Sequence, residues 1–314
     1  MIVGSGALAT LFAHRLAISG TQVNMLVGWP DGLTALSQNG ARLVDGEIES
    51  AVSVNVSNKA LDFANSTRAL VLVKSWQTAR AANQLADCLG QDGIALSLQN
   101  GLGNYEILAD HLGEQRVALG STTTGASLLA PGQVRAGGEG QIVVAEHARI
   151  DSIFEGLVQA GFDVGKTDKL AELLWGKLAI NAAINPLTAL LEIANGELLG
   201  RPDYESWMQS LAYEVAELAA AQGFELPYDN AFEMAAEVAR RTASNYSSML
   251  QDIRRGAPTE IEAICGSVVR QGKKMKVETP SNQQMLQWVL EKAQGTSKDF
   301  AQLINNNVPE VAIS

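Results

Sequence analysis

The sequence is poor in the residues that build disulfide frameworks, metal sites and nucleic-acid surfaces. Its 314 residues include only two cysteines, Cys88 and Cys265, and three histidines. Two cysteines so far apart form neither a disulfide framework nor a zinc motif, so we expect no metal and a reducing, cytoplasmic environment. With 23 basic and 34 acidic residues, the formal net charge is −11. A chain this acidic repels nucleic-acid phosphate and anionic membrane surfaces, and we expect neither as a partner.

Long apolar runs are also missing. The longest one in the second half, residues 170–191, is interrupted by charged and amide side chains and by Pro186, so it is too polar for a membrane span. No basic leader precedes an apolar stretch, and we expect no signal peptide. The length and the 46% content of hydrophobic residues favour about two domains with large cores.

The first half alternates short β-rich runs with helical patterns. Strands are predicted at 23–27, 52–56, 69–73, 94–98 and 117–119, and helices at 7–19, 32–39, 77–89 and 104–112. Several strand runs are almost wholly apolar, which is typical of strands covered on both faces. The alternation predicts a doubly wound parallel sheet. Residues 134–136 and 141–145, separated by glycines, predict a hairpin at its edge.

From about Leu170 onward the periodicity becomes helical and strand signals nearly vanish. An apolar face is predicted from residues three and four apart, at Trp207, Leu211, Val215 and Leu218. Another helix is expected to begin at Pro280. The sequence therefore predicts an α/β domain at residues 1–166 and an all-helical domain for substrate and dimer contacts at residues 167–314.

A glycine-rich segment follows the first three residues. It fits the pattern G-x-G-x-x-G/A with Gly4, Ser5, Gly6, Ala7, Leu8 and Ala9. In that pattern Gly4 permits a tight turn, Gly6 lets the backbone approach a pyrophosphate, and Ala9 allows close packing of helix on strand. The free N–H groups of the helix then face the phosphates. This segment predicts a Rossmann-type dinucleotide-binding domain, with a purely structural turn as the alternative.

The sequence contains only a weak signal for the choice between NAD(H) and NADP(H). An acidic residue about 20 positions beyond the glycines favours NAD(H), and an arginine there favours the 2′-phosphate of NADP(H). The second predicted strand ends near Gly28 without an arginine, and Asp31 lies beyond its tip. An ordinary turn residue is the simpler interpretation of Asp31, so the choice between the two cofactors stays open.

Three polar residues mark one face of an otherwise apolar helix. Lys177, Asn181 and Asn185 are spaced four apart among leucine, isoleucine and alanine, so they form one stripe. Burying them without partners would cost several kcal/mol, which favours a cavity over the alternative of a surface stripe. Hydride addition to a ketone leaves charge on the oxygen, and a positioned acid lowers that barrier. Burial moves a lysine pKa toward neutrality, so Lys177 is the candidate acid for a small 2-keto acid.

Several segments together resemble the ketopantoate reductase (2-dehydropantoate 2-reductase) family. Residues 177–189 are similar to the family's lysine helix, and Asn195-Gly196-Glu197-Leu198 follows at the expected distance. A serine–methionine–glutamine–aspartate motif and its threonine–glutamate end match residues 247–252 and 259–262. Residues 73–77, 99–103 and 120–126 resemble cofactor-side loops. The resemblance covers nearly the whole chain.

The resemblance implies NADPH-dependent reduction of 2-dehydropantoate to pantoate by a homodimer, and it implies a role for each matching residue. Lys177 would donate the proton, and Glu260 would lie beside the ribose or the substrate. The substrate would be held by Asn181, Asn185, Asn195 and Ser248. The cofactor would be contacted by Lys74 and Ala126, and Asn100 would contact both cofactor and substrate.

Alternatives and departures accompany this prediction. Lys74 could be a solvated lysine at a strand end, and Asn100 could begin a plain turn. Where the family often has an arginine, this chain has Gly28, and Ala257 follows Gly256 where another arginine is common. Glu262 replaces the usual aspartate. The substrate could therefore be a related 2-keto or 3-hydroxy acid, and a non-catalytic nucleotide-binding sensor is the rival of another class.

Overall fold

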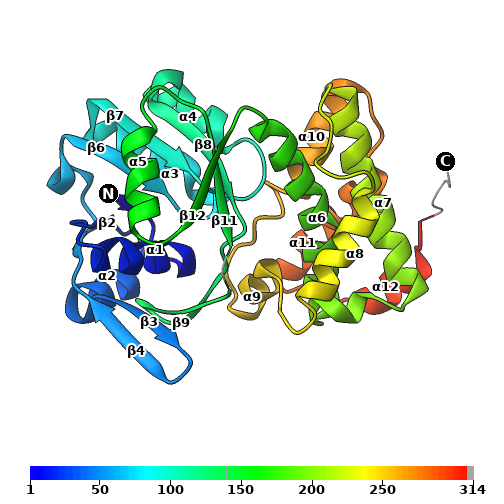
Figure 1. Ribbon diagram of the computed structural model, residues 1–314. Coiled ribbons are helices and arrows are strands. Elements are labelled where there is room, and N and C mark those ends of the chain that lie inside the picture. Colours follow the sequence, from blue (N-terminus) through cyan, green and yellow to red (C-terminus); the bar gives the residue numbers. More distant parts are fainter. Residues whose placement is uncertain (139, 310–314) are drawn as a thin grey trace. The chain divides into compact units, whose positions relative to one another are not determined.

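The protein forms two compact units in a computed structural model, which describes residues 1–138 and 140–309. The α/β unit comprises Met1–Gln99 and Gly103–Leu170, and the helical unit comprises Asn100–Leu102 and Ala171–Ser314 (Figure 1). Both cysteines are buried and free. None of the helices described is long and apolar enough to cross a membrane.

The larger sheet of the α/β unit has the order β12-β11-β8-β7-β6-β1-β2-β5. Its strands are β1 (Ile2–Val3), β2 (Asn24–Leu26), β5 (Asn55–Ser57), β6 (Ser66–Val71), β7 (Leu89–Ser97), β8 (Val117–Thr122), β11 (Gln141–Ala145) and β12 (Asp163–Thr167). The two-residue β1 is fully buried and pairs in parallel with both β2 and β6. The glycine segment therefore follows an internal strand of a largely parallel sheet.

Two strand predictions are wrong in detail. The hairpin does not form, because β10 (Gln133–Ala136) belongs to a second sheet of order β4-β3-β10-β9, whereas β11 pairs with β8 and β12. The run 52–56 is divided between β4 (Ile48–Val52) and β5, again in different sheets. The remaining strands are β3 (Ala41–Asp45) and β9 (Ala126–Ala130). Burial explains the failure: Val134 and Ile142 are each fully buried in separate sheets, and long-range packing overrides a local turn signal.

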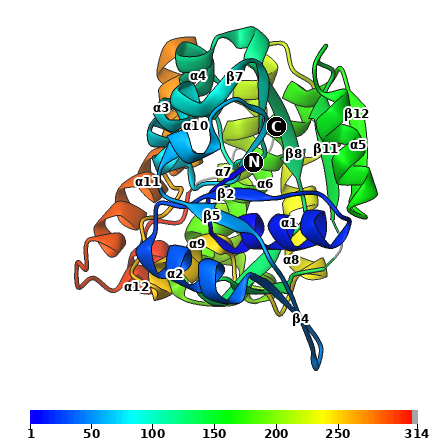
Figure 2. The same cartoon turned by 90° about the vertical axis from the view of Figure 1, so that its left-hand side faces the viewer.

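Helices cover both faces of the main sheet (Figure 2). They are α1 (Ala7–Ile18), α2 (Pro30–Asn39), α3 (Thr78–Cys88), α4 (Asn104–Leu112) and α5 (Asp151–Gln159). One core joins Phe12 of α1 and Leu157 of α5 to the sheet, and a second joins Leu85 of α3 and Leu108 of α4. Two cores with the sheet between them are what a doubly wound fold requires.

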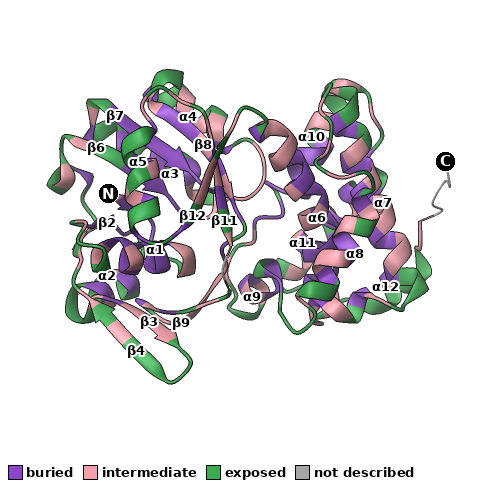
Figure 3. Cartoon of the chain, viewed as in Figure 1, coloured by how far each residue is buried: buried purple, intermediate pink, exposed green. Residues whose placement is uncertain are grey.

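The helical unit is built around one long buried helix, α6 (Leu170–Leu191) (Figure 3). The others are α7 (Pro202–Ala221), α8 (Ala231–Arg241), α9 (Ser248–Arg254), α10 (Cys265–Met275), α11 (Pro280–Ala293) and α12 (Phe300–Asn306). The predicted apolar face of α7 is confirmed, since its four residues are all buried. The predicted fold class, an α/β sheet followed by a helical region, is confirmed as well.

Candidate active site

The polar stripe lies on α6, as its spacing predicts. Asn185 is buried, and Lys177 and Asn181 are half-buried. The intervening Leu178, Ala179 and Ala182 belong to the central core of the unit and thereby fix the rotation of the helix. The stripe is thus held by packing on rigid secondary structure, which positions side chains better than a loop does.

Burial changes the acid strength of Lys177. Loss of water around the amine lowers its pKa to about 8, and the negative charge of Glu260 acts in the opposite direction. A group titrating near 8 is still mostly protonated at neutral pH, yet it releases its proton far more readily than an exposed lysine. This is the property that a general acid needs.

The backbone just before Lys177 is held by the chain segment before α8. Tyr228 donates a hydrogen bond of 2.7 Å from its hydroxyl to the carbonyl oxygen of Gly176. A β-carbon on Gly176 would lie 2.7 Å from Cδ of Pro227, so glycine is required for this close approach. Burial raises the pKa of Tyr228, so its hydroxyl stays a donor. No local pattern in the sequence predicts this contact.

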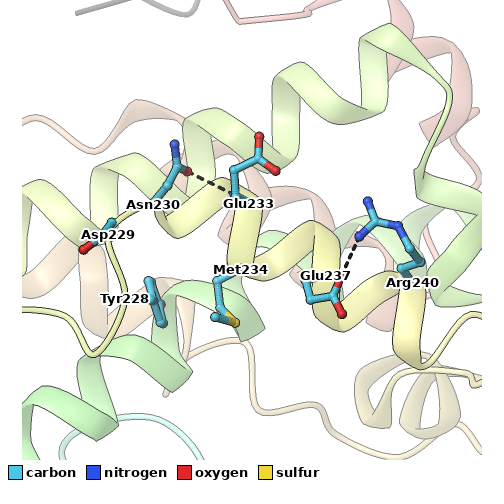
Figure 4. Close-up of a pocket in the computed structure, with 7 residues that line it drawn as sticks. All are labelled: Tyr228, Asp229, Asn230, Glu233, Met234, Glu237 and Arg240. Atoms are coloured by element: carbon cyan, nitrogen blue, oxygen red, sulfur yellow. Dashed lines mark hydrogen bonds and ion pairs between the residues drawn. The ribbon is translucent and has the colours of Figure 1, made fainter.

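Tyr228 also lines a surface pocket along α8 (Figure 4). On its wall, Glu237 pairs with Arg240 at 2.6 Å, and the Asn230 side chain accepts a hydrogen bond from the Glu233 backbone N–H. None of the predicted site residues lines this pocket. We therefore do not assign it to the chemistry of Lys177.

A short loop from the first half of the sequence is part of the helical unit. Asn100 donates a hydrogen bond of 3.3 Å from Nδ2 to Oε2 of the buried Glu260. Next to it, Gly101 has φ +78°, and a β-carbon there would collide with the carbonyl oxygen of Ala263. The Leu102 N–H donates to that same oxygen at 3.1 Å. Asn100 is therefore more than the start of a plain turn, because it orients the carboxylate that acts on Lys177.

Residues 242–247 connect Asn195 with α6. The Asn195 N–H donates to the Asn245 carbonyl, and its side-chain Nδ2 donates to the Thr242 hydroxyl at 2.9 Å. The buried Oδ1 of Asn195 has no hydrogen-bond partner among the described residues. At the other end of the segment, the Ser247 hydroxyl lies 2.7 Å from that of Thr188 on α6. The buried Oδ1 of Asn195 requires a hydrogen-bond partner, and a ligand hydroxyl would supply one.

Ser248 and its neighbour differ in their surroundings. Ser247 is buried and caps α9 by accepting from the Leu250 N–H at 3.1 Å. Ser248 is the exposed first residue of α9. Ser248, the predicted substrate residue, is therefore available to a ligand. The Thr188–Ser247 contact anchors the start of α9 to the helix that carries Lys177.

The glycine segment has the backbone that its pattern predicts. Gly4 has φ +127°, and a β-carbon there would lie 2.9 Å from the Leu72 carbonyl oxygen. At Gly6, the N-cap of α1, a β-carbon would meet nothing within 4 Å, and no acidic residue or side-chain cap occupies the first turn. Gly4 is thus required by the fold, whereas Gly6 leaves open space before free N–H groups, which fits a dinucleotide pyrophosphate.

The loops after β6 and β7 are tied together beside this segment of the sheet. Gln99 donates from Nε2 to the Val73 carbonyl at 3.0 Å and to the Thr78 hydroxyl at 2.8 Å, and that hydroxyl lies 2.8 Å from Asn104. Lys74, half-buried, follows Val73 directly. Ala126 begins β9 and is half-buried. The network fixes Lys74 at the carboxyl edge of a parallel strand, where α/β sheets bind ligands.

Comparison with known proteins places the chain in a class and then in a family. A solved ketopantoate reductase from Ralstonia eutropha has a TM-score of 0.87 and 28% identity, covering 94% of this chain and 99% of that chain. A D-mandelate dehydrogenase solved with NADH has a TM-score of 0.88 at 22% identity and covers 94% of this chain and 99% of that chain, so it shows the fold alone. The class is that of oxidoreductases.

Within that class the chain belongs to the ketopantoate reductase family. The family model described as "Ketopantoate reductase PanE/ApbA" matches residues 1–149, and its C-terminal counterpart matches residues 169–293. A 2-dehydropantoate 2-reductase of Halobacterium salinarum is 34% identical over 89% of this chain and 94% of its own length. One of Archaeoglobus fulgidus is 35% identical over 92% and 95%. The resemblance drawn from the sequence motifs is confirmed.

Proposed function

We propose that this protein reduces 2-dehydropantoate to pantoate with NADPH, and that Lys177 is the general acid. The observation that carries the proposal is the half-buried amine of Lys177, whose pKa is lowered to about 8 on a stripe with two amides. The relatives named above act on this keto acid by name. When bound, the nicotinamide supplies hydride to the keto carbon.

The residues of the helical unit have distinct tasks in this reaction. Lys177 donates a proton from Nζ to the oxygen that was the keto group, and Glu260, oriented by Asn100, keeps that amine protonated. Asn181 and Asn185 donate amide hydrogens to the anionic substrate, beside the exposed Ser248. The unpaired Oδ1 of Asn195 accepts from the substrate hydroxyl.

The α/β unit would hold the cofactor. Residues 4–9 approach the pyrophosphate, Lys74 contributes positive charge, and Ala126 lines the nicotinamide side. In this division of labour, residues 1–166 bind the dinucleotide and residues 167–314 bind the substrate. We also propose a cytoplasmic homodimer, for which light scattering at several protein concentrations is the test.

The experiment for the activity is a substrate panel. The purified protein is mixed with NADPH or NADH and with 2-dehydropantoate, pyruvate, 2-ketoisovalerate or phenylglyoxylate, and loss of the nicotinamide absorbance is followed. We expect the largest kcat/KM for 2-dehydropantoate with NADPH. A larger value for another keto acid would move the substrate assignment to that acid, and cofactor binding without turnover on any of them would favour a nucleotide sensor.

A further inference from the structure

The side chain of Arg80 lies beside Gly28, the position at which the family often has an arginine. Gly28 follows β2, and a β-carbon built on it would lie 3.0 Å from Nη1 of Arg80 and 3.1 Å from its Cζ and Nη2. Arg80 is in the first turn of α3, the helix that follows β6. Its guanidinium therefore occupies the space over Gly28 that a side chain at the end of β2 would fill.

The sheet order explains how Arg80 reaches this position. β1 pairs with β6 on one side and β2 on the other. The side chain of Arg80 thus crosses from the β6 side, past the carboxyl end of β1, to the β2 side. The glycine segment begins at that end of β1, with the Gly4 N–H donating to the Leu26 carbonyl at 3.0 Å. The guanidinium of Arg80 and the glycine segment therefore lie at the same edge of the sheet.

This edge is where a dinucleotide-binding fold reads the adenosine ribose. An arginine near the end of the second strand accommodates a 2′-phosphate, because a planar guanidinium offers paired N–H donors to phosphate oxygens. Arg80 is exposed, and no carboxylate among residues 1–138 and 140–309 forms an ion pair with it. Gly28 contributes by its missing side chain, which would crowd the guanidinium.

We propose that Arg80 binds the 2′-phosphate of NADP(H) and thereby sets the cofactor preference of this protein. The cation comes from the start of α3 instead of from the end of β2. The proposal rests on the proposed function only in that both require a dinucleotide at residues 4–9. It assigns to Arg80 the contact with the 2′-phosphate that an arginine at position 28 would otherwise make.

The test measures binding of two nucleotide fragments to the full-length protein by calorimetry, without turnover. Adenosine 2′,5′-bisphosphate carries the 2′-phosphate, and 5′-AMP lacks it. For Arg80→Ala we expect bisphosphate affinity to fall about 10–100-fold, as for a lost hydrogen bond to a charged group, with little change for 5′-AMP. Arg80→Lys should recover part of the loss. Arg68→Ala, which removes the same charge at the opposite end of β6, is the matched control and should alter neither affinity.

A second variant tests the position independently of the packing of Arg80. Gly28→Glu places a carboxylate beside the guanidinium, so it should weaken the bisphosphate and spare 5′-AMP. If Arg80→Ala leaves the bisphosphate affinity unchanged, or lowers both affinities equally, the role of Arg80 is refuted while a reductase using NADH survives. If the unaltered protein binds neither fragment, the dinucleotide site and the role of Arg80 both fail.

Discussion

The two units present their functional groups in different ways. In the α/β unit the candidate cofactor contacts are mostly backbone positions, such as Gly4 and Gly6, and side chains that emerge from loops at the carboxyl edge of the sheet. In the helical unit they are side chains on α6, whose rotation is fixed by a buried core. A phosphate chain can be held by N–H groups and open space, whereas proton transfer needs one titratable atom in a controlled environment.

This difference separates the effects that substitutions should have. Removing a side chain from the helical unit should affect the chemical step and leave the fold intact. Adding a side chain should reduce stability in either unit where space is filled, and it should reduce cofactor affinity at the glycine segment of the α/β unit, where space is open. The following predictions test that separation, beginning with the largest effect.

Lys177→Ala should lower kcat by about 10²–10⁴-fold, because the developing oxyanion loses its acid. The affinity for NADPH should stay within about threefold of the original value. Steady-state kinetics and a cofactor titration measure the two quantities. Lys273→Ala, which removes an exposed lysine near the end of α10, is the control. Wild-type turnover in Lys177→Ala would remove this residue from the mechanism.

Gly101→Ala should destabilise the protein by more than the roughly 1–3 kcal/mol expected from backbone strain alone. A β-carbon there meets the Ala263 carbonyl in addition to the positive φ. Gly103→Ala is the matched control, since Gly103 also has a positive φ, +96°, but nothing lies within 4 Å of its β-carbon. Denaturant unfolding compares the two. Equal losses would show that the loop does not dock against Ala263.

Gly6→Ala should weaken cofactor binding about tenfold, a change of about 1.4 kcal/mol, while thermal stability stays nearly the same. The added methyl group meets no protein atom within 4 Å but enters the space proposed for the pyrophosphate. Gly4→Ala should instead reduce thermal stability, because its β-carbon would meet the carbonyl oxygen of Leu72. Calorimetry and thermal melting measure both. A Gly6 variant with unchanged affinity would contradict the pyrophosphate assignment.

The pH dependence should show the smallest effect. Lys177 must be protonated to act as the acid, so kcat/KM for reduction should decline as pH rises through about 8. The Glu260 carboxylate raises the pKa of Lys177. Glu260→Gln removes that charge and should move the alkaline limb to lower pH. Glu262→Gln, at an exposed carboxylate that pairs with Arg270, is the control. A limb that moves to higher pH, or stays in place, would contradict the coupling.

Local patterns predicted a large part of this molecule. The glycine segment, the helix beginning at residue 7 and the polar stripe of α6 follow from turn chemistry and from periodicities of two and 3.6 residues. These features depend on neighbours within a few positions. The hairpin at residues 134–145 was predicted by the same kind of reasoning and is wrong, because β10 and β11 find their partners in different sheets.

By itself, the sequence determined the two-part organisation, the glycine segment and the stripe of Lys177, Asn181 and Asn185, since each is a repeat or a turn within a short stretch of chain. Only the tertiary structure decided that Asn100 orients Glu260 and that Arg80 covers Gly28. The physical reason is that strand order and loop docking are set by burial between distant segments, and no local pattern records which distant segment will arrive.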